Sequence, residues 1–229
     1  MTAARGRTGR PPLTEERKAE IRLEIASAAV ELFVTQGVAA TTGEQIGQAV
    51  GVSARTVWRY FPSKESCVSP LFSEGIELIA ALLREWAPDE PLERLFDRTL
   101  ATEIGVIGRL ERATVRDLVR LTRTEPGLRA VWLQTYDEAE PAFARALAER
   151  ARLPADGLEP TIQAAMFNAA LRAAVEHHAW RTADTGTEPA TAETELMETL
   201  RSALAVAAGG VGQGLGVERG CGAGCHTFR

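Results

Sequence analysis

Apolar residues recur at intervals of three and four along most of the chain, which is the pattern of amphipathic helices. The first stripe of this kind includes Ile21, Ile25, Ala29 and Phe33. The alternating Val, Ile and Thr runs that are typical of strands are missing. The pattern therefore predicts an all-α fold of about nine helices.

The first helix has clear boundary signals. Thr14 is a suitable N-cap, and Glu15 and Glu16 follow in the first turn, where the helix dipole favours acidic side chains. Gly37 stands where a helix end favours a left-handed residue. We therefore predict a helix over about residues 15–36.

Two short helices joined by a tight turn follow. Thr41 or Thr42 begins the first of them with a capping-box pattern, and Ser53 begins the second, which covers residues 54–60. Gly51 lies at the centre of the turn between them. This arrangement is a helix-turn-helix signature, in which the second helix enters the major groove of DNA.

Longer helices are predicted over the rest of the chain. A fourth helix begins at Ser63-Lys64, and Pro70 and Pro141 are expected to kink or end the helices that contain them. Stretches rich in Pro and Gly separate the later helices, which are expected at about 90–108, 111–123, 127–152, 159–183 and 190–208. The predicted organisation is a basic arm (1–16), a helix-turn-helix domain (17–78), a C-terminal helical domain (79–208) and a Gly-rich disordered tail (209–229).

The charge of the chain is unevenly distributed. The net charge of −5 alone argues against a nucleic-acid partner. Residues 1–66, however, contain nine basic and seven acidic residues, a net charge of +2, whereas residues 67–208 contain 15 basic and 23 acidic residues, a net charge of −8. Residues 45–64 carry a charge of +3 and no acid. The basic charge is therefore concentrated on the helix-turn-helix, as expected of an element that docks on DNA.

The residues on and around the second short helix suit contact with DNA. Arg55 can bind a guanine through two hydrogen bonds, and Thr56 can meet a base edge or a thymine methyl group. Other side chains there offer donors to phosphates. Alternatively, the aromatic residues pack a small core, as we expect for Phe61, and the charges are solvated. The candidate DNA-binding residues are Thr42, Ser53, Arg55, Thr56, Trp58, Arg59, Tyr60 and Lys64.

A dense run of motif residues covers this N-terminal region. It consists of Ala28-Ala29-x-x-Leu32-Phe33-x-x-x-Gly37, then Thr41-Thr42, Ile46, Gly51-Val52-Ser53 and Thr56-Val57-Trp58-Arg59-Tyr60-Phe61-Pro62-Ser63-Lys64-Glu65. Through these residues, positions 17–78 resemble the DNA-binding domain of the tetracycline-repressor (TetR) family of bacterial regulators. The chain departs from the family pattern at Gly43 and Gly47, where residues are usually larger, at Arg55, where Gly is frequent, and at Trp58, where Tyr is usual. Arg55 is therefore the best single candidate for a distinct base preference.

The resemblance implies a two-fold, all-helical homodimer that binds operator DNA through its N-terminal domain. It also implies that residues 79–208 bind a small effector and form the dimer. The last two long helices, about 159–208, are rich in Ala and Leu and are the expected interface, because short side chains let helices approach closely. Alternatively, they only cover the core of one protomer. The implied function is a sequence-specific transcriptional repressor released from a palindromic operator by a largely apolar effector; a regulator that answers to no ligand is an alternative.

Candidate effector contacts come from the C-terminal helices. Helical spacing does not separate a pocket lining from a packed core. Asn168, the only Asn in the chain, lies on an apolar helix and needs a partner, which a ligand, the backbone or water can supply. His177 and His178 point about 100° apart on a helix and are poorly placed to ligate one metal. The candidate ligand-binding residues are Trp86, Phe96, Ile104, Leu118, Trp132, Tyr136, Met166 and Asn168.

Other function classes have weaker signals. No uninterrupted apolar run has the roughly 18–20 residues of a membrane span, and no secretory signal is recognisable, so we expect a cytoplasmic protein without a membrane partner. We find no metal pair, phosphate loop or nucleophile with a base, and we expect no enzyme activity, no cofactor and no metal site. The segment Cys221-x-x-x-Cys225-His226 leaves a metal- or redox-responsive regulator as the alternative function.

Overall fold

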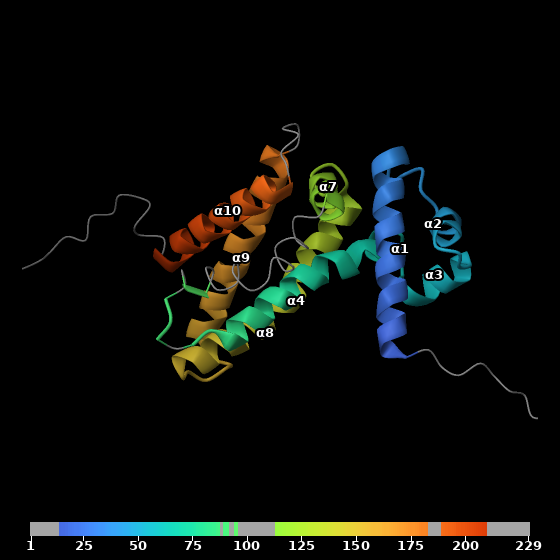
Figure 1. Cartoon of the computed structure of the whole chain (residues 1–229). Coiled ribbons are helices and arrows are strands. Elements are labelled where there is room, and N and C mark those ends of the chain that lie inside the picture. Colours follow the sequence, from blue (N-terminus) through green and yellow to red (C-terminus); the bar gives the residue numbers. More distant parts are fainter. Residues whose placement is uncertain (1–13, 88, 92–93, 96–112, 183–188, 210–229) are drawn as a thin grey trace, which may run out of the picture. The chain divides into compact units, whose positions relative to one another are not determined.

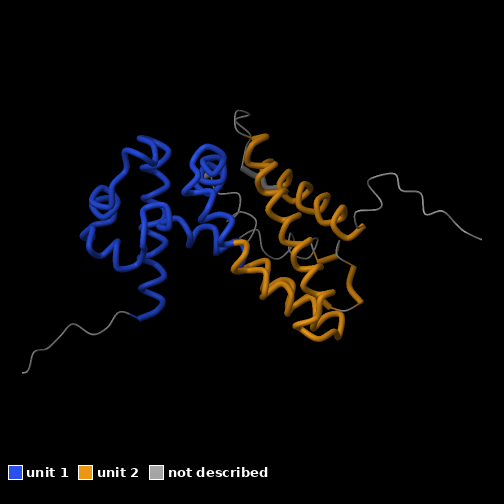
Figure 2. The backbone as a smooth tube through the Cα atoms, turned by 180° about the vertical axis from the view of Figure 1, so that it is seen from behind, with its two compact units in different colours: residues 1–77, 112–135 blue, residues 78–111, 136–229 orange. Residues whose placement is uncertain are grey.

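The computed structural model describes residues 14–87, 89–91, 94–95, 113–182 and 189–209 (Figure 1). Over these ranges every regular element is a helix, which confirms the predicted all-α class. The chain divides into two compact units, one of residues 1–77 and 112–135 and the other of residues 78–111 and 136–229 (Figure 2).

Helix α1 (Glu15–Gln36) has the predicted bounds and supplies much of the core of the first unit. Thr14 caps it by accepting a hydrogen bond from the Arg17 amide, and Gly37 follows its end with φ 87°. A stripe of residues at helical spacing is fully buried: Ile25, Ala26, Ala29, Val30 and Phe33. Burial of such a stripe, rather than helix propensity, is what holds a helix in a folded protein.

Helices α2 (Gly43–Ala49) and α3 (Ala54–Tyr60) form the predicted helix-turn-helix on one side of α1 (Figure 1). Thr42 and Gln45 make a complete capping box at the start of α2. Ser53 caps α3 by accepting a hydrogen bond from the Thr56 amide. Each short helix therefore satisfies its first N–H groups locally, which offsets the poor intrinsic stability of seven-residue helices.

The predicted fourth helix begins as one 3₁₀ turn, η1 (Glu65–Val68), and continues as α4 (Ser69–Glu85). Pro70 neither kinks nor ends α4, because it stands in the first turn, where its missing N–H has no helical partner. The stretch Glu65–Glu85 has the length and apolar composition of a membrane span, and 44% of the scored window is buried in the protein. Buried Leu71, Phe72 and Ile76 explain that composition, since they belong to the core.

Helices α7 (Ala113–Leu121) and the beginning of α8 (Pro126–Ala151) complete the first unit. Helix α7 packs against α1, and Leu118 and Val119 are fully buried. Trp132 of α8 meets Phe72 of α4 edge to face, with ring centroids 4.6 Å apart. This unit thus includes residues 112–135, which the sequence pattern assigned to the C-terminal domain.

The second unit is built on the rest of α8, on α9 (Leu158–Arg181) and on α10 (Pro189–Gly209). Helices α9 and α10 pack along each other (Figure 1). Helix α8 continues through Pro141, so the break expected there does not occur. The predicted helix at 90–108, apart from a few of its first residues, and the predicted tail lie outside the described residues.

Candidate nucleic-acid interface

Two glycines allow α2 and α3 to approach closely at the turn. Gly51 has φ +71°, a backbone conformation that other residues adopt only with strain. A Cβ atom on Gly47 would lie 2.7 Å from the Val52 carbonyl oxygen, and the Val52 amide donates to the Gly47 carbonyl at 2.8 Å. Gly47 therefore lets the turn lie against α2, a gain that opposes its cost in helix propensity.

Helix α3 buries one side and exposes a basic side. Val57 is fully buried, whereas Arg55 and Arg59 are exposed one helical turn apart. Over the part of the chain that the structure describes, the Arg55 guanidinium has no ion-pair or hydrogen-bond partner. A free arginine on an exposed short helix after a tight turn is an arrangement that suits direct reading of a guanine.

Trp58 lies across the first residue of α2. A Cβ atom on Gly43 would stand 2.0 Å from Cζ2 of the Trp58 indole, so the two positions are size-matched. The indole remains 43% exposed. Two of the four departures from the family pattern, Gly43 and Trp58, are therefore a single structural feature, a large ring in the space left by a missing side chain.

The side chains of Thr42, Ser53 and Thr56 make hydrogen bonds to nearby residues of the chain. Thr42 accepts from the Gln45 amide at 3.3 Å, and Ser53 accepts from the Thr56 amide at 3.2 Å. The Ser53 and Thr56 hydroxyl oxygens also lie 3.0 Å apart. These side chains fix the N-terminal ends of α2 and α3, where free N–H groups and the helix dipole favour anions.

Tyr60 is held between two arginines. The guanidinium carbon of Arg59 lies 5.0 Å from the centre of the Tyr60 ring, and that of Arg22 lies 5.6 Å from it. Arg59 also donates a 3.4 Å hydrogen bond to the Tyr60 hydroxyl. The ring borders a hollow of about 470 Å³ between α1, the end of α3 and α4. The sequence did not single out Arg22, since no local pattern relates it to a residue 38 positions away.

Lys64 has a structural role that its sequence position did not reveal. Its ammonium group donates to the carbonyl oxygens of Val38 at 2.6 Å, Thr41 at 3.1 Å and Ala39 at 3.4 Å. An ammonium group has three donors, and all three are used here. Phosphate contact by Lys64 stays a prediction, and the structure assigns the side chain first to the loop between α1 and α2.

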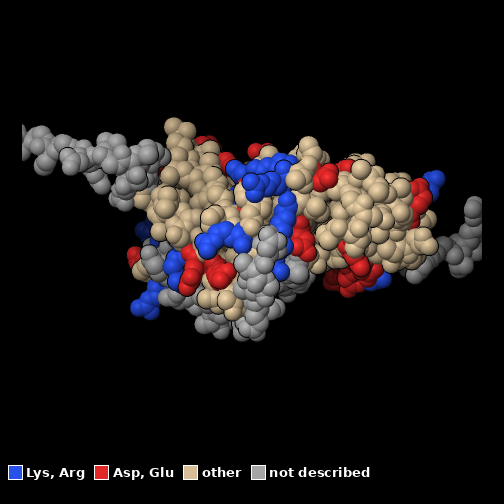
Figure 3. Space-filling model, turned by 90° about the horizontal axis from the view of Figure 1, so that it is seen from above, with Lys and Arg blue, Asp and Glu red and all other residues tan. Residues whose placement is uncertain are grey.

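Basic and acidic side chains are interspersed on the described surface seen in Figure 3. On α1, Arg17 pairs with Glu20 at 2.7 Å, and Lys18 pairs with Glu15 at 2.7 Å. The hydrogen bond from Lys18 lowers the pKa of the exposed Glu15 carboxyl. The positive charge of α1 is thus partly neutralised within the helix, in contrast to Arg55 on α3.

The candidate effector residues are divided between the two units. Leu118 and Trp132 are core residues of the first unit, while Trp86, Tyr136, Met166 and Asn168 belong to the second. Trp86 donates to the Glu90 carbonyl at 2.8 Å, and the guanidinium of Arg150 lies 3.6 Å from its ring centre. Phe96 and Ile104 lie outside the described residues.

Cys67 is the one cysteine within the described ranges, and it is fully buried. Burial, with the nearby Glu65 carboxylate, raises the pKa of its thiol to about 12. Such a thiol stays protonated and unreactive at neutral pH. The described ranges contain no group of three or more His, Cys, Asp or Glu side chains placed to hold a metal ion. Cys221, Cys225 and His226 lie outside them.

Comparison with known proteins gives consistent matches over both parts of the chain. Residues 25–70 match the family model described as bacterial regulatory proteins, tetR family, and residues 90–211 match that of the MftR C-terminal domain. The HTH-type transcriptional regulator TcmR of Streptomyces glaucescens is 32% identical over 205 residues, which cover 85% of this chain and 88% of TcmR.

Solved structures give matches of lower overall similarity. A TetR-family transcriptional regulator from Mesorhizobium loti is 20% identical, with 84% of this chain and 98% of that one covered and a TM-score of 0.49. Thermus thermophilus FadR, solved in complex with lauroyl-CoA, is 26% identical, with 80% and 93% covered and a TM-score of 0.43.

Proposed function

Since the chain belongs to the TetR family of bacterial regulatory proteins, we propose that it is a cytoplasmic repressor released from a palindromic operator by a small effector. Members of this family are DNA-binding transcriptional regulators that act as dimers and bind small-molecule effectors. The observation that carries the proposal is the capped helix-turn-helix with an exposed Arg55 on α3, whose guanidinium has no partner among the described residues.

Binding to DNA from around the protein's own gene tests this function. Fluorescence anisotropy of a labelled fragment, measured between about 50 and 200 mM salt, is expected to give an affinity that falls steeply with salt, because phosphate contacts release counterions. An unrelated fragment of equal length is the control. Equal affinity for both fragments at every salt concentration contradicts a sequence-specific regulator.

Arg55→Ala is expected to relax the preference for one base position by roughly 10- to 100-fold, the range expected for a bidentate contact with guanine. Arg59→Ala is the matched control, since Arg59 stacks on Tyr60 and is expected to weaken binding to all sequences alike. Competition assays with operators substituted at single positions measure both effects. Uniform loss of affinity in Arg55→Ala would refute its role in base reading.

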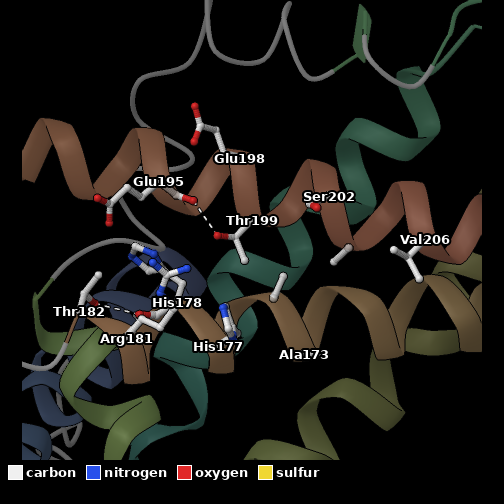
Figure 4. Close-up of a pocket in the computed structure, with 12 residues that line it drawn as sticks. Ala173, His177, His178, Arg181, Thr182, Glu195, Glu198, Thr199, Ser202 and Val206 are labelled. Carbon is white, nitrogen blue, oxygen red and sulfur yellow. Dashed lines mark hydrogen bonds between the residues drawn. The ribbon is translucent and has the colours of Figure 1, made fainter. Parts of the chain in front are cut away.

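The outer face of α9 and α10 supports the proposed dimer interface within residues 159–208. A hollow of about 680 Å³ lies between the two helices (Figure 4). His177 and Arg181 line it from α9, and Glu195 and Glu198 line it from α10. A two-fold interface places one patch against its own copy, and a patch with basic and acidic edges can be self-complementary. Val206, 74% exposed on α10, adds an apolar contact at the same hollow.

Val206→Glu is expected to weaken dimerisation by roughly 100-fold, because the two-fold axis would bury two unpaired carboxylates. Analytical ultracentrifugation over a range of concentrations measures the dimer dissociation constant. Val34→Glu, at an exposed valine of α1, is the control and is expected to leave the constant unchanged. A Val206→Glu protein that dimerises like the wild type would place the interface elsewhere.

We assign effector binding to the second unit. The support is a group of polar side chains enclosed there among apolar ones, namely Tyr136, Asn168 and Glu176. Within the second unit, Trp86 and Met166 remain candidate contacts. Effector binding favours a conformer in which the two α3 helices of the dimer no longer match successive major grooves, which are about 34–36 Å apart.

A further inference from the structure

A polar stripe runs along α9 where it faces α8. Asn168, Arg172 and Glu176 follow one another at intervals of four residues and therefore share one face of α9. Tyr136 and Glu140 of α8 lie opposite, since both contact Asn168. We call these five residues the Asn168 cluster. The Phe143 and Phe167 rings, 5.3 Å apart at their centres, belong to the same two helices.

The orientation of the Asn168 amide is fixed by its partners. Its Nδ2 donates to the Tyr136 carbonyl oxygen at 3.0 Å and to Glu140 Oε2 at 3.2 Å. Rotating the amide by 180° would bring Oδ1 against two acceptor oxygens, so the assignment of its nitrogen and oxygen is secure. Both protons of Nδ2 are thereby used, and Oδ1 points away from both acceptors.

The Asn168 Oδ1 atom is enclosed and has no donor among the described residues. Asn168 is only 7% exposed, and no side chain or backbone group of the described ranges donates a hydrogen bond to Oδ1. A buried acceptor without a donor costs roughly 1–3 kcal/mol of stability. Folded proteins seldom retain such a group unless a ligand or an ordered water completes it.

Two acids and one base among the five residues of the Asn168 cluster disfavour an anionic ligand. Glu176 is only 7% exposed, and its carboxylate lies 3.5 Å from the Arg172 guanidinium. Glu140 contributes a second carboxylate. Burial, followed by the Glu176 charge, raises the pKa of the Tyr136 hydroxyl, which therefore stays neutral. The Asn168 cluster thus holds two acids against one base and offers an acceptor.

We propose that the effector is an uncharged, largely apolar molecule whose hydroxyl or N–H group donates a hydrogen bond to Asn168 Oδ1. This inference rests on the proposed effector-binding function and adds the chemical class of the ligand. The ligand donates the third hydrogen bond of the Asn168 amide, and its apolar body lies against the aromatic side chains of α8 and α9.

Three probes of nearly equal size test the proposal on the full-length protein: 2-naphthol, 2-methoxynaphthalene and 2-naphthoate. 2-Naphthol carries a hydrogen-bond donor, 2-methoxynaphthalene carries none, and 2-naphthoate carries a negative charge. Isothermal titration calorimetry is expected to show at least about tenfold tighter binding of 2-naphthol than of either other probe, the effect of one hydrogen bond to an otherwise unpaired acceptor. Equal affinities, tighter binding of 2-naphthoate, or no binding of 2-naphthol at about 1 mM overturns the proposal.

Asn168→Leu removes the acceptor and is expected to abolish the preference for 2-naphthol. Leu171→Met, a volume-conserving change at a buried residue three positions further along α9, is expected to preserve it. A preference that survives in a folded Asn168→Leu protein also overturns the proposal, and the wild-type ranking decides the question if that variant does not fold. DNA binding is measured separately, so a protein that binds its operator without discriminating the probes refutes the ligand class alone.

Discussion

Gly43→Ala is expected to reduce operator affinity at least about tenfold while changing the free energy of unfolding by less than about 1 kcal/mol. A Cβ atom on residue 43 would lie 2.0 Å from the Trp58 indole, so the ring must leave its place. Since the indole is 43% exposed, it can turn toward solvent at low cost, and alanine is the better helix former. The change is therefore expected to act on the surface of α3 that we propose to face DNA rather than on the fold.

A double-mutant cycle separates this mechanism from a general effect of the methyl group. In a Trp58→Phe background the smaller ring leaves room at position 43, and Gly43→Ala is expected to have little further effect on operator affinity. Glu44→Ala, at the exposed next residue of α2, is the control for changes in the first turn. Equal losses from Gly43→Ala in both backgrounds would show that the two positions act independently.

Lys64→Ala is expected to lower the stability of the first unit by roughly 2–3 kcal/mol, because hydrogen bonds from a charged donor are the stronger ones. Three carbonyl oxygens between α1 and α2 lose the ammonium donor together, and of these Val38 keeps the Thr41 amide as a donor. Hydrogen exchange of the slowest α1 amides reports the free energy of opening of this unit.

Lys64→Met tests whether the charge or the aliphatic stem of Lys64 matters. It keeps most of the stem, and is expected to lose nearly as much stability as Lys64→Ala. If Lys64→Met instead kept wild-type protection and only weakened binding to all DNA sequences equally, Lys64 would be a phosphate contact and not a support of the loop.

Local signals in the sequence were enough to predict the helices of the first unit. Helix ends are marked by the caps Thr14, Thr42 and Ser53 and by the glycines Gly37 and Gly51. The cap hydrogen bonds join residues within four positions of each other. Such contacts are legible in sequence because each depends only on nearby residues. Phe61 is likewise buried, as expected from its place after α3.

Long-range contacts were not predictable in the same way. Several contacts join residues 15 to 38 positions apart. They are the pairs Gly43–Trp58 and Arg22–Tyr60 and the hydrogen bonds from Lys64 to the loop after α1. The packing of α7 against α1 is a contact of the same kind. Helical periodicity identifies the apolar face of a helix but not the element that packs on it. For this reason the sequence pattern grouped Leu118 and Trp132 with residues of the second unit, whereas the structure places both in the core of the first.

Asn168 illustrates how far sequence reasoning extends into the second unit. A lone amide on an apolar helix predicts a buried polar group that needs partners. The structure adds that Tyr136 and Glu140 take its two donor protons, while no described residue donates to its oxygen. The chemical class of the ligand follows only from that geometry.

Selection of bound sequences from a random pool of double-stranded DNA tests the central claim most directly. A TetR-family dimer with α3 in the major groove is expected to enrich a palindrome whose half-sites lie about one helical turn, or a multiple of it, apart. The Arg55→Ala protein is expected to lose one guanine preference in each half-site. A pool that shows no enriched motif after repeated rounds would contradict the account that this protein is a sequence-specific regulator.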